Sequence, residues 1–193
     1  MKPRPALAAF LAAAGIGYAV AAGIPAESRL RAALDDVLAV SSRATSPSAL
    51  ATAVGPVLQR HVRFETMTRR AVGVGCRQFT PEQQERATEL FKTLIIRSYS
   101  DKFTPGEQPV IQYKTAVLPA PGRVDVPTSL TYKGSHYAVS YRLEEVDDWK
   151  IVDVVIEGVS LVGNYRSQFD SIFKQGGVDA VIRSLEQSVA PSR

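Results

Sequence analysis

The spacing of apolar residues changes twice along this chain of 193 residues, and these changes constrain the fold more than any other feature. Before the Pro105-Gly106 pair, apolar residues recur every three or four positions, which is typical of amphipathic helices. Between residues 111 and 156 they alternate with polar residues, as in half-buried β-strands. Helical spacing returns after residue 164. The order of helices, strands and helices predicts an α+β domain with helices folded onto one face of a sheet.

The clearest helix signal is the sequence Thr80-Pro81-Glu82-Gln83. The threonine hydroxyl can accept a hydrogen bond from the glutamine amide, the glutamine side chain can reach back to the cap, and proline suits the first helical turn. A long helix to Tyr99 is therefore predicted. Apolar spacing predicts further helices over residues 27–40, 47–61 with an interruption near Gly55-Pro56, 64–72, and a final pair divided by Gly176-Gly177.

About four strands are expected, over residues 111–117, 124–130, 137–143 and 149–156. The loops between them are short and rich in turn residues, so consecutive antiparallel pairing is predicted. Pro127 cannot donate a hydrogen bond to a neighbouring strand, which places its strand at an edge or at a bulge. The last strand is apolar on both faces, so it is expected to be central or covered on both sides. Its pattern leaves open which face lines the interior.

Residues 1–22 are typical of a secretory signal peptide that is cleaved, and residues 23–193 are expected to form a single domain. Lys2 and Arg4 precede an apolar run that ends in the small-x-small sequence Ala19-Val20-Ala21. A membrane anchor is the alternative, but the run is short and is interrupted by glycines. The mature protein is therefore predicted to be exported to the periplasm.

The sequence offers little catalytic or metal-binding chemistry. The two histidines, His61 and His136, lie far apart without other ligands at metal-binding spacing, so no metal or cofactor is expected. Cys76 is the single cysteine and has no neighbouring base that would activate it. Asp153 interrupts a strand of isoleucine and valine, where it could be a proton-transfer base or, more commonly, a residue that pairs with an arginine or faces solvent at an edge. The formal net charge of +4 gives no argument for nucleic acid.

Residues 149–169 resemble the signature of the MlaC family, the periplasmic phospholipid-binding proteins that are also known as toluene-tolerance components. The resemblance extends over roughly residues 57–187. Cys76-Arg77 departs from it, because the family more usually has Trp-Arg at this point. Because a large aromatic side chain is lost here, the resemblance does not determine which residues line or gate the pocket near the third helix. Three further segments are similar to the family in order and spacing: residues 64–73, 80–99 and 173–185.

The resemblance implies a twisted, mainly antiparallel sheet and several helices that enclose an apolar pocket for phospholipid acyl chains, with the head group towards solvent. It implies a monomeric, non-enzymatic carrier. Such a carrier moves phospholipid between an inner-membrane ABC transporter complex, which has an MCE-domain subunit, and an outer-membrane lipoprotein. At about 0.8 kcal/mol per buried methylene, two acyl chains with some 30 methylenes represent on the order of 25 kcal/mol of exposure to water. Apolar walls remove that barrier, and no nucleophile is needed.

Given such a pocket, the period and parity of the apolar residues place particular side chains on its wall. Arg69, Arg70 and Arg166 are candidates for contact with the lipid phosphate, because a guanidinium group suits phosphate. The residues expected to line the pocket are Tyr113, Val117, Val139, Tyr141, Val152 and Val154 from the sheet, and Phe64, Met67, Phe91, Leu94, Ile95, Tyr99 and Phe169 from the helices.

Other functions stay open at this stage. A domain of this composition could bind a different lipid, such as a hopanoid, or could be an interaction module with a filled core. It could also be a cone-shaped α+β enzyme with Asp153 as the base. The enzyme requires Asp153 to point into the cavity with an oxyanion donor opposite.

Overall fold

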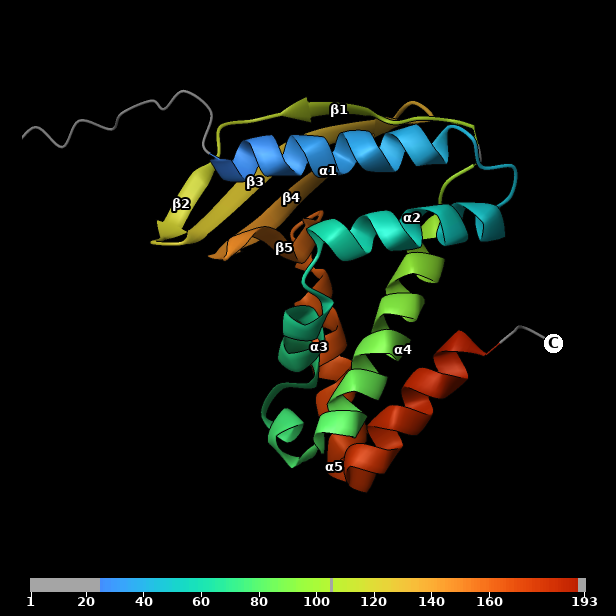
Figure 1. The fold of residues 1–193 in the computed structure, drawn as a ribbon, viewed down its shortest axis with the longest axis vertical. Coiled ribbons are helices and arrows are strands. Elements are labelled where there is room, and N and C mark those ends of the chain that lie inside the picture. Colours follow the sequence, from blue (N-terminus) through green and yellow to red (C-terminus); the bar gives the residue numbers. More distant parts are fainter. Residues whose placement is uncertain (1–24, 105, 191–193) are drawn as a thin grey trace, which may run out of the picture.

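An antiparallel sheet forms the upper part of the molecule in Figure 1, and α3, α4 and α5 extend below it. The structure is a computed structural model that describes residues 25–104 and 106–190, so the predicted signal peptide lies outside the described residues. Within these ranges the predicted α+β class is confirmed. The helices are α1 (Pro25–Ser41), α2 (Pro47–His61), α3 (Phe64–Val72), the 3-10 helix η1 (Gly73–Gln78), α4 (Pro81–Ser100) and α5 (Leu161–Val189). The strands are β1 (Val110–Tyr113), β2 (Val117–Ala120), β3 (Arg123–Tyr132), β4 (Ser135–Val146), β5 (Asp148–Ile156) and β6 (Val159–Ser160).

Local signals in the sequence account for two of the helix boundaries. The Thr80 hydroxyl accepts a hydrogen bond from the Gln83 amide at 3.2 Å, and the Gln83 side chain accepts one from the Thr80 amide at 2.9 Å. The predicted capping box of α4 is therefore confirmed. The predicted division of the C-terminal helices is present as a kink within α5, where Gly177 has a φ of +62°. Glycine adopts this left-handed conformation without a steric cost.

The predicted interruption of α2 near Gly55-Pro56 is wrong, because the helix continues through it. A proline inside a helix removes one backbone hydrogen bond. Leu50, Val54 and Val57 are all buried along α2, on both sides of the proline in sequence. Their packing against the rest of the protein offsets the lost hydrogen bond.

The sheet has the strand order β1-β3-β4-β5-β6, with β2 also paired to β3. The first predicted strand, over residues 111–117, is in fact two short strands that pair with opposite ends of β3. Pro127 lies in β3 between these two pairing segments, so its missing N–H interrupts no ladder there. β3 is therefore an interior strand whose outer neighbour is broken at the proline. This break and the two-residue strand β6 explain why the sheet has six strands rather than about four.

A bulge explains why β5 is apolar at nearly every position. The adjacent β4 residues Arg142-Leu143 pair with Asp153 and Ile151, which are separated by Val152. An extra residue in one strand shifts the alternation of its side chains. Ile151 before the bulge and Val154 after it both belong to the apolar contacts beneath α1. Val152 and Asp153 line a hollow instead. The parity that the sequence left open therefore changes within the strand.

Buried apolar side chains of the described residues gather in two clusters. The sheet cluster lies between α1 and the strands β3, β4 and β5, and it includes Leu30 and Val126. The helical cluster lies among α2, α3, α4 and α5, and it includes Met67 and Phe91. In Figure 1 α1 lies along the sheet, whereas α3, α4 and α5 extend away from it, so the helices do not all cover one face as predicted. Val62, in the link between α2 and α3, packs against both clusters.

Candidate functional site

The residues predicted to line a pocket from the helices lie together in the helical cluster. Phe91 is fully buried, and its ring centroid lies 5.0 Å from that of Tyr165 and 6.0 Å from that of Phe169. These edge-on contacts are favourable beyond the burial of apolar area. The members of the predicted set that are buried in the cluster or packed against it are Phe64, Met67, Phe91, Leu94, Ile95, Tyr99 and Phe169.

The residues predicted to line a pocket from the sheet are more scattered. Tyr113, Tyr141 and Val154 pack against the sheet cluster. Burial raises the pKa of the Tyr141 hydroxyl well above its ordinary value, which reflects its apolar surroundings. Val139 is buried on β4, whereas Val117 is exposed on the edge strand β2. The sheet set therefore does not face the helical set across one shared space, and its role in lining a pocket stays a prediction.

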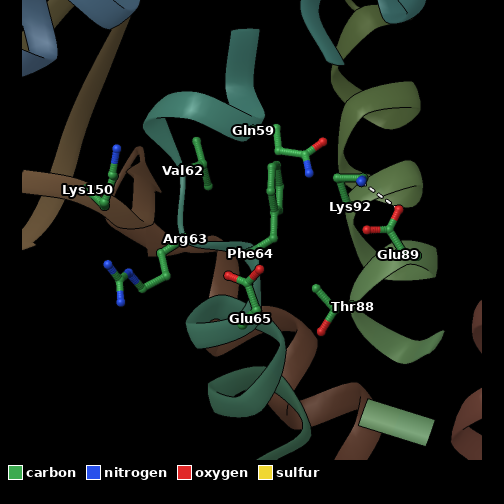
Figure 2. A pocket seen from close by; sticks show the side chains of 9 residues that line it. All are labelled: Gln59, Val62, Arg63, Phe64, Glu65, Thr88, Glu89, Lys92 and Lys150. Atoms are coloured by element: carbon green, nitrogen blue, oxygen red, sulfur yellow. Dashed lines mark ion pairs between the residues drawn. The ribbon is translucent and has the colours of Figure 1, made fainter. Parts of the chain in front are cut away.

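The two clusters meet where the link between α2 and α3 crosses β5. The Arg63 amide donates a hydrogen bond to the Ile151 carbonyl at 2.9 Å, and Val62 forms a parallel bridge with Ile151. A cavity of about 180 Å³ opens beside this crossing. In Figure 2 the side chains of Val62 and Phe64 lie beside this cavity. We refer to it as the seam cavity; it is lined by Gln59, Val62, Arg63, Phe64, Glu65, Thr88, Glu89, Lys92 and Lys150.

Cationic side chains outnumber carboxylates around the seam cavity. Arg63, Lys92 and Lys150 stand against Glu65 and Glu89. Lys92 Nζ lies 2.5 Å from Glu89 Oε2, as the dashed line in Figure 2 shows, so this pair is locally neutral. Arg63 donates a hydrogen bond to the Val146 carbonyl at 2.9 Å, which fixes its side chain without neutralising it. Lys150 donates one to the Arg60 carbonyl at 2.6 Å, and its Nζ also lies 3.8 Å from Asp148 Oδ2. Among the described residues Arg63 has no carboxylate within ion-pair distance, so it is the cation of this lining that is best placed to attract an anionic group, beside the aromatic side chain of Phe64.

A larger hollow, of about 610 Å³, lies where the sheet, α3 and the start of α5 meet. Its lining includes Arg70, Arg123, Arg142 and Arg166, and we refer to it as the arginine groove. Two of the arginines predicted to contact a head group, Arg70 and Arg166, are therefore brought together; Arg166 Nη1 donates to the Arg70 carbonyl at 3.3 Å. The third, Arg69, is exposed and lines neither cavity. Contact of any of them with a head group stays a prediction.

Ion pairs hold the guanidinium groups of the arginine groove in place. Glu144 bridges two of them, with Arg70 Nη2 at 2.7 Å and Arg123 Nε at 3.0 Å from its two carboxylate oxygens. On the neighbouring positions, Arg142 Nε lies 3.7 Å from Asp125 Oδ2. Opposite charges that face each other across strands stabilise a sheet. These ion pairs therefore fix the positions of the charged side chains that line the groove.

Asp153 is bound on both of its carboxylate oxygens. Arg142 Nη1 and the Ser160 hydroxyl donate to Oδ2 at 3.0 and 2.6 Å, and the Val162 amide donates to Oδ1 at 3.1 Å. These contacts tie β4, β5 and the first turn of α5 to one buried carboxylate. Pairing with an arginine is therefore confirmed, whereas the alternative that Asp153 faces solvent at an edge is wrong. A carboxylate with every oxygen engaged is poorly placed to act as a free base.

Several charged residues of the groove were not singled out by sequence reasoning, although a signal for them exists. Arg123 and Asp125 alternate with apolar residues in β3, and Arg142 and Glu144 do so in β4. The two strands are joined by the two-residue turn Lys133-Gly134, which sets the register so that residues 123 and 125 face residues 144 and 142. A strand register deduced from this turn would have predicted that Arg123 pairs with Glu144, and Asp125 with Arg142, on one face of the sheet.

Other functional chemistry is sparse in the part of the chain that the structure describes. No three or more His, Cys, Asp or Glu side chains among the described residues are grouped so that they could hold a metal ion. None of the described helices is both long and apolar enough to cross a membrane. Cys76 packs against the helical cluster, and burial raises the pKa of its thiol, which keeps it in the less reactive thiol form.

The fold, the two apolar clusters and the charged openings beside them define a small α+β binding domain. The sequence profile of the MlaC protein family matches residues 30–187. This match covers most of the chain, which therefore belongs to the MlaC family, and the resemblance found in the sequence is confirmed.

Two known proteins illustrate the relationship. The toluene tolerance protein ttg2D of Pseudomonas putida is 29% identical over 105 residues, which are 53% of this chain and 49% of that protein, so the match spans about half the length of the relative. The phospholipid-binding protein of Ralstonia solanacearum, whose structure was solved in complex with a phospholipid, is 28% identical with a TM-score of 0.78. That superposition covers 86% of this chain and 97% of the other.

Proposed function

We propose that this protein is a carrier that binds a diacyl phospholipid by its acyl chains. The observation that supports this most directly is the likeness to a phospholipid-bound protein over 86% of the chain, with a TM-score of 0.78. The seven helical residues predicted to contact lipid gather in one apolar cluster, which adds to this support. Burial of some 30 methylenes would remove on the order of 25 kcal/mol of exposure to water.

The acyl chains would enter between the helical cluster and the sheet cluster, at the seam cavity. Val62 contacts both clusters there, and Phe64 stands at the boundary of the helical one. The cations Arg63 and Lys150 beside the cavity suit the lipid phosphate. In this arrangement the chains lie among apolar side chains while the head group stays at the charged opening.

The carrier would act in the periplasm after removal of residues 1–22. Its donor and acceptor would be an inner-membrane ABC transporter complex, through the MCE-domain subunit, and an outer-membrane lipoprotein. Membership of the MlaC family supports this role. No enzymatic step is proposed, and the engagement of both oxygens of Asp153 weighs against the alternative of a proton-transfer enzyme.

Native mass spectrometry of the protein purified from its own host tests the proposal. A co-purified diacyl phospholipid, identified after dissociation, is the expected result. A polycyclic lipid would replace the proposal with the alternative of another ligand, and protein that is reproducibly empty would refute it.

The entrance is tested separately by the variants Arg63→Ala and Lys150→Ala. Loss of a charged hydrogen bond to phosphate costs about 1.5–3 kcal/mol, so phospholipid affinity should fall at least tenfold. Arg43→Ala is the matched control, since Arg43 is exposed and lies outside both cavities. Unchanged phospholipid affinity in both Arg63→Ala and Lys150→Ala would contradict the proposed position of the head group, but not lipid binding itself.

A further inference from the structure

The most exposed charges of the arginine groove are arginines, whereas two of its carboxylates, Glu144 and Asp153, lie deeper. The side chains of Arg123 and Arg142 are 59% and 46% exposed, whereas those of Glu144 and Asp153 are 17% and 7% exposed. Arg166 is also exposed and has no carboxylate within ion-pair distance among the described residues. Solvent therefore meets guanidinium groups that are already oriented by the carboxylates behind them, which favours an approaching anion.

Exposed aliphatic side chains lie next to these charges. Pro119 and Ala120 of β2 line the groove, and the preceding residues Val117 and Leu118 are 54% and 62% exposed. Arginine is enriched at protein interfaces, and the buried centre of an interface is more apolar than the rest of the protein surface. Isolated exposed apolar residues are common, but here they adjoin a preformed hollow.

We propose that the arginine groove and β2 form a docking surface for a segment of a partner protein that carries carboxylates next to aliphatic side chains. The carboxylates would pair with Arg123, Arg142 and Arg166, and the aliphatic side chains would cover Val117 and Leu118. A phospholipid is less well matched, because the lining of the groove is dominated by charged side chains that would leave acyl chains in a polar environment. A flat membrane surface is also less well matched, because Glu144 holds Arg70 and Arg123 at the sheet surface inside a hollow.

A photo-crosslinking amino acid at position 118, introduced into the full-length protein in its native host, tests this surface. The matched control carries the same amino acid at position 74, since Val74 is 71% exposed on η1 and lies outside the groove. Both versions are combined with Arg123→Ala, which leaves Glu144 paired with Arg70 and therefore preserves the network. Arg77→Ala serves as the matched loss of an exposed arginine elsewhere. The crosslinked segment is mapped by mass spectrometry, synthesised and titrated against each variant.

The expected result is an adduct from position 118 that is absent from position 74 and maps to an acidic segment with aliphatic residues. The synthetic segment should bind at least tenfold more weakly to Arg123→Ala and equally to Arg77→Ala. An adduct with lipid or with a second copy of the chain, equal adducts from both positions, or binding that is insensitive to Arg123 would overturn the proposal. Lipid occupancy of the purified Arg123→Ala protein should equal that of the wild type, so failure here is distinguishable from failure of the proposed carrier function.

Discussion

Replacement of Asp153 by alanine should be among the most destabilising single substitutions in the chain. Asp153 is buried, and loss of its carboxylate leaves the Arg142 guanidinium, the Ser160 hydroxyl and the Val162 amide without their common acceptor. Removal of one partner from a buried ion pair costs about 3–5 kcal/mol. In the variant the Arg142 guanidinium is half exposed and keeps its ion pair with Asp125 at 3.7 Å, so part of the lost stabilisation is recovered. We therefore expect about 3 kcal/mol for Asp153→Ala.

Urea denaturation followed by far-ultraviolet circular dichroism measures this loss through the shift of the midpoint at constant slope. Asp153→Asn keeps one acceptor oxygen and should lose about half as much, because a neutral hydrogen bond is weaker than a charged one. Asp170→Ala is the control, since Asp170 pairs with Lys174 at 2.6 Å on the exposed side of a helix, and such pairs contribute less than about 0.5 kcal/mol.

A double-mutant cycle with Arg142→Ala decides whether the ion pair itself carries the effect. If Asp153 acts through Arg142, the double variant should lose less stability than the sum of the two single variants, because the pair is already broken. A loss below about 1 kcal/mol for Asp153→Ala, or additive losses in the cycle, would show that Asp153 does not tie β4, β5 and α5 together in the way described.

Three further substitutions test separate features of the structure. Thr80→Ala removes the side-chain cap of α4 and should cost about 1 kcal/mol in urea denaturation. Gly75→Ala places a Cβ 2.8 Å from the Phe173 ring and should cost roughly 1–3 kcal/mol, with an unchanged melting temperature contradicting this packing. Hydrogen bonds from His61 and Arg60 hold the pKa of Asp36 below its ordinary value, so their stabilisation is present above that value and is lost as pH falls through the lowered pKa. Asp36→Asn should remove this acid-side dependence from a series of melting temperatures measured between about pH 6 and pH 2.5.

Local signals in the sequence predict most of the helices, because helix periodicity and capping depend on residues that are neighbours in the chain. The capping box at Thr80 and the break at Gly176-Gly177 are of this kind. The continuation of α2 through Pro56 is not, since it depends on packing against other elements. The split of the first strand is also a tertiary effect, because it follows from where β1 and β2 meet β3.

In the candidate site, too, local patterns predict some residues, whereas contacts between distant elements determine others. Phe91 and Phe169 could be predicted together in one cluster, because each recurs at helical spacing on an apolar face. Val152 and Asp153 could not be placed, because a single bulge residue reverses the parity that alternation would assign. The ion pair between Arg70 and Glu144 escapes a residue-by-residue reading because the two residues are 74 positions apart in sequence.

The presence of two apolar clusters, rather than one, bears directly on how a carrier can load. A single filled core could admit acyl chains only by losing the packing that holds the fold together. Here Val62 packs against both clusters, and it lies at the seam cavity with Phe64 of the helical cluster. Exposure of a buried valine or phenylalanine costs about 1.5–3 kcal/mol, whereas burial of two acyl chains yields on the order of 25 kcal/mol. Under the proposed carrier function, removal of acyl chains from water offsets the separation of the clusters, while each cluster keeps its own contacts.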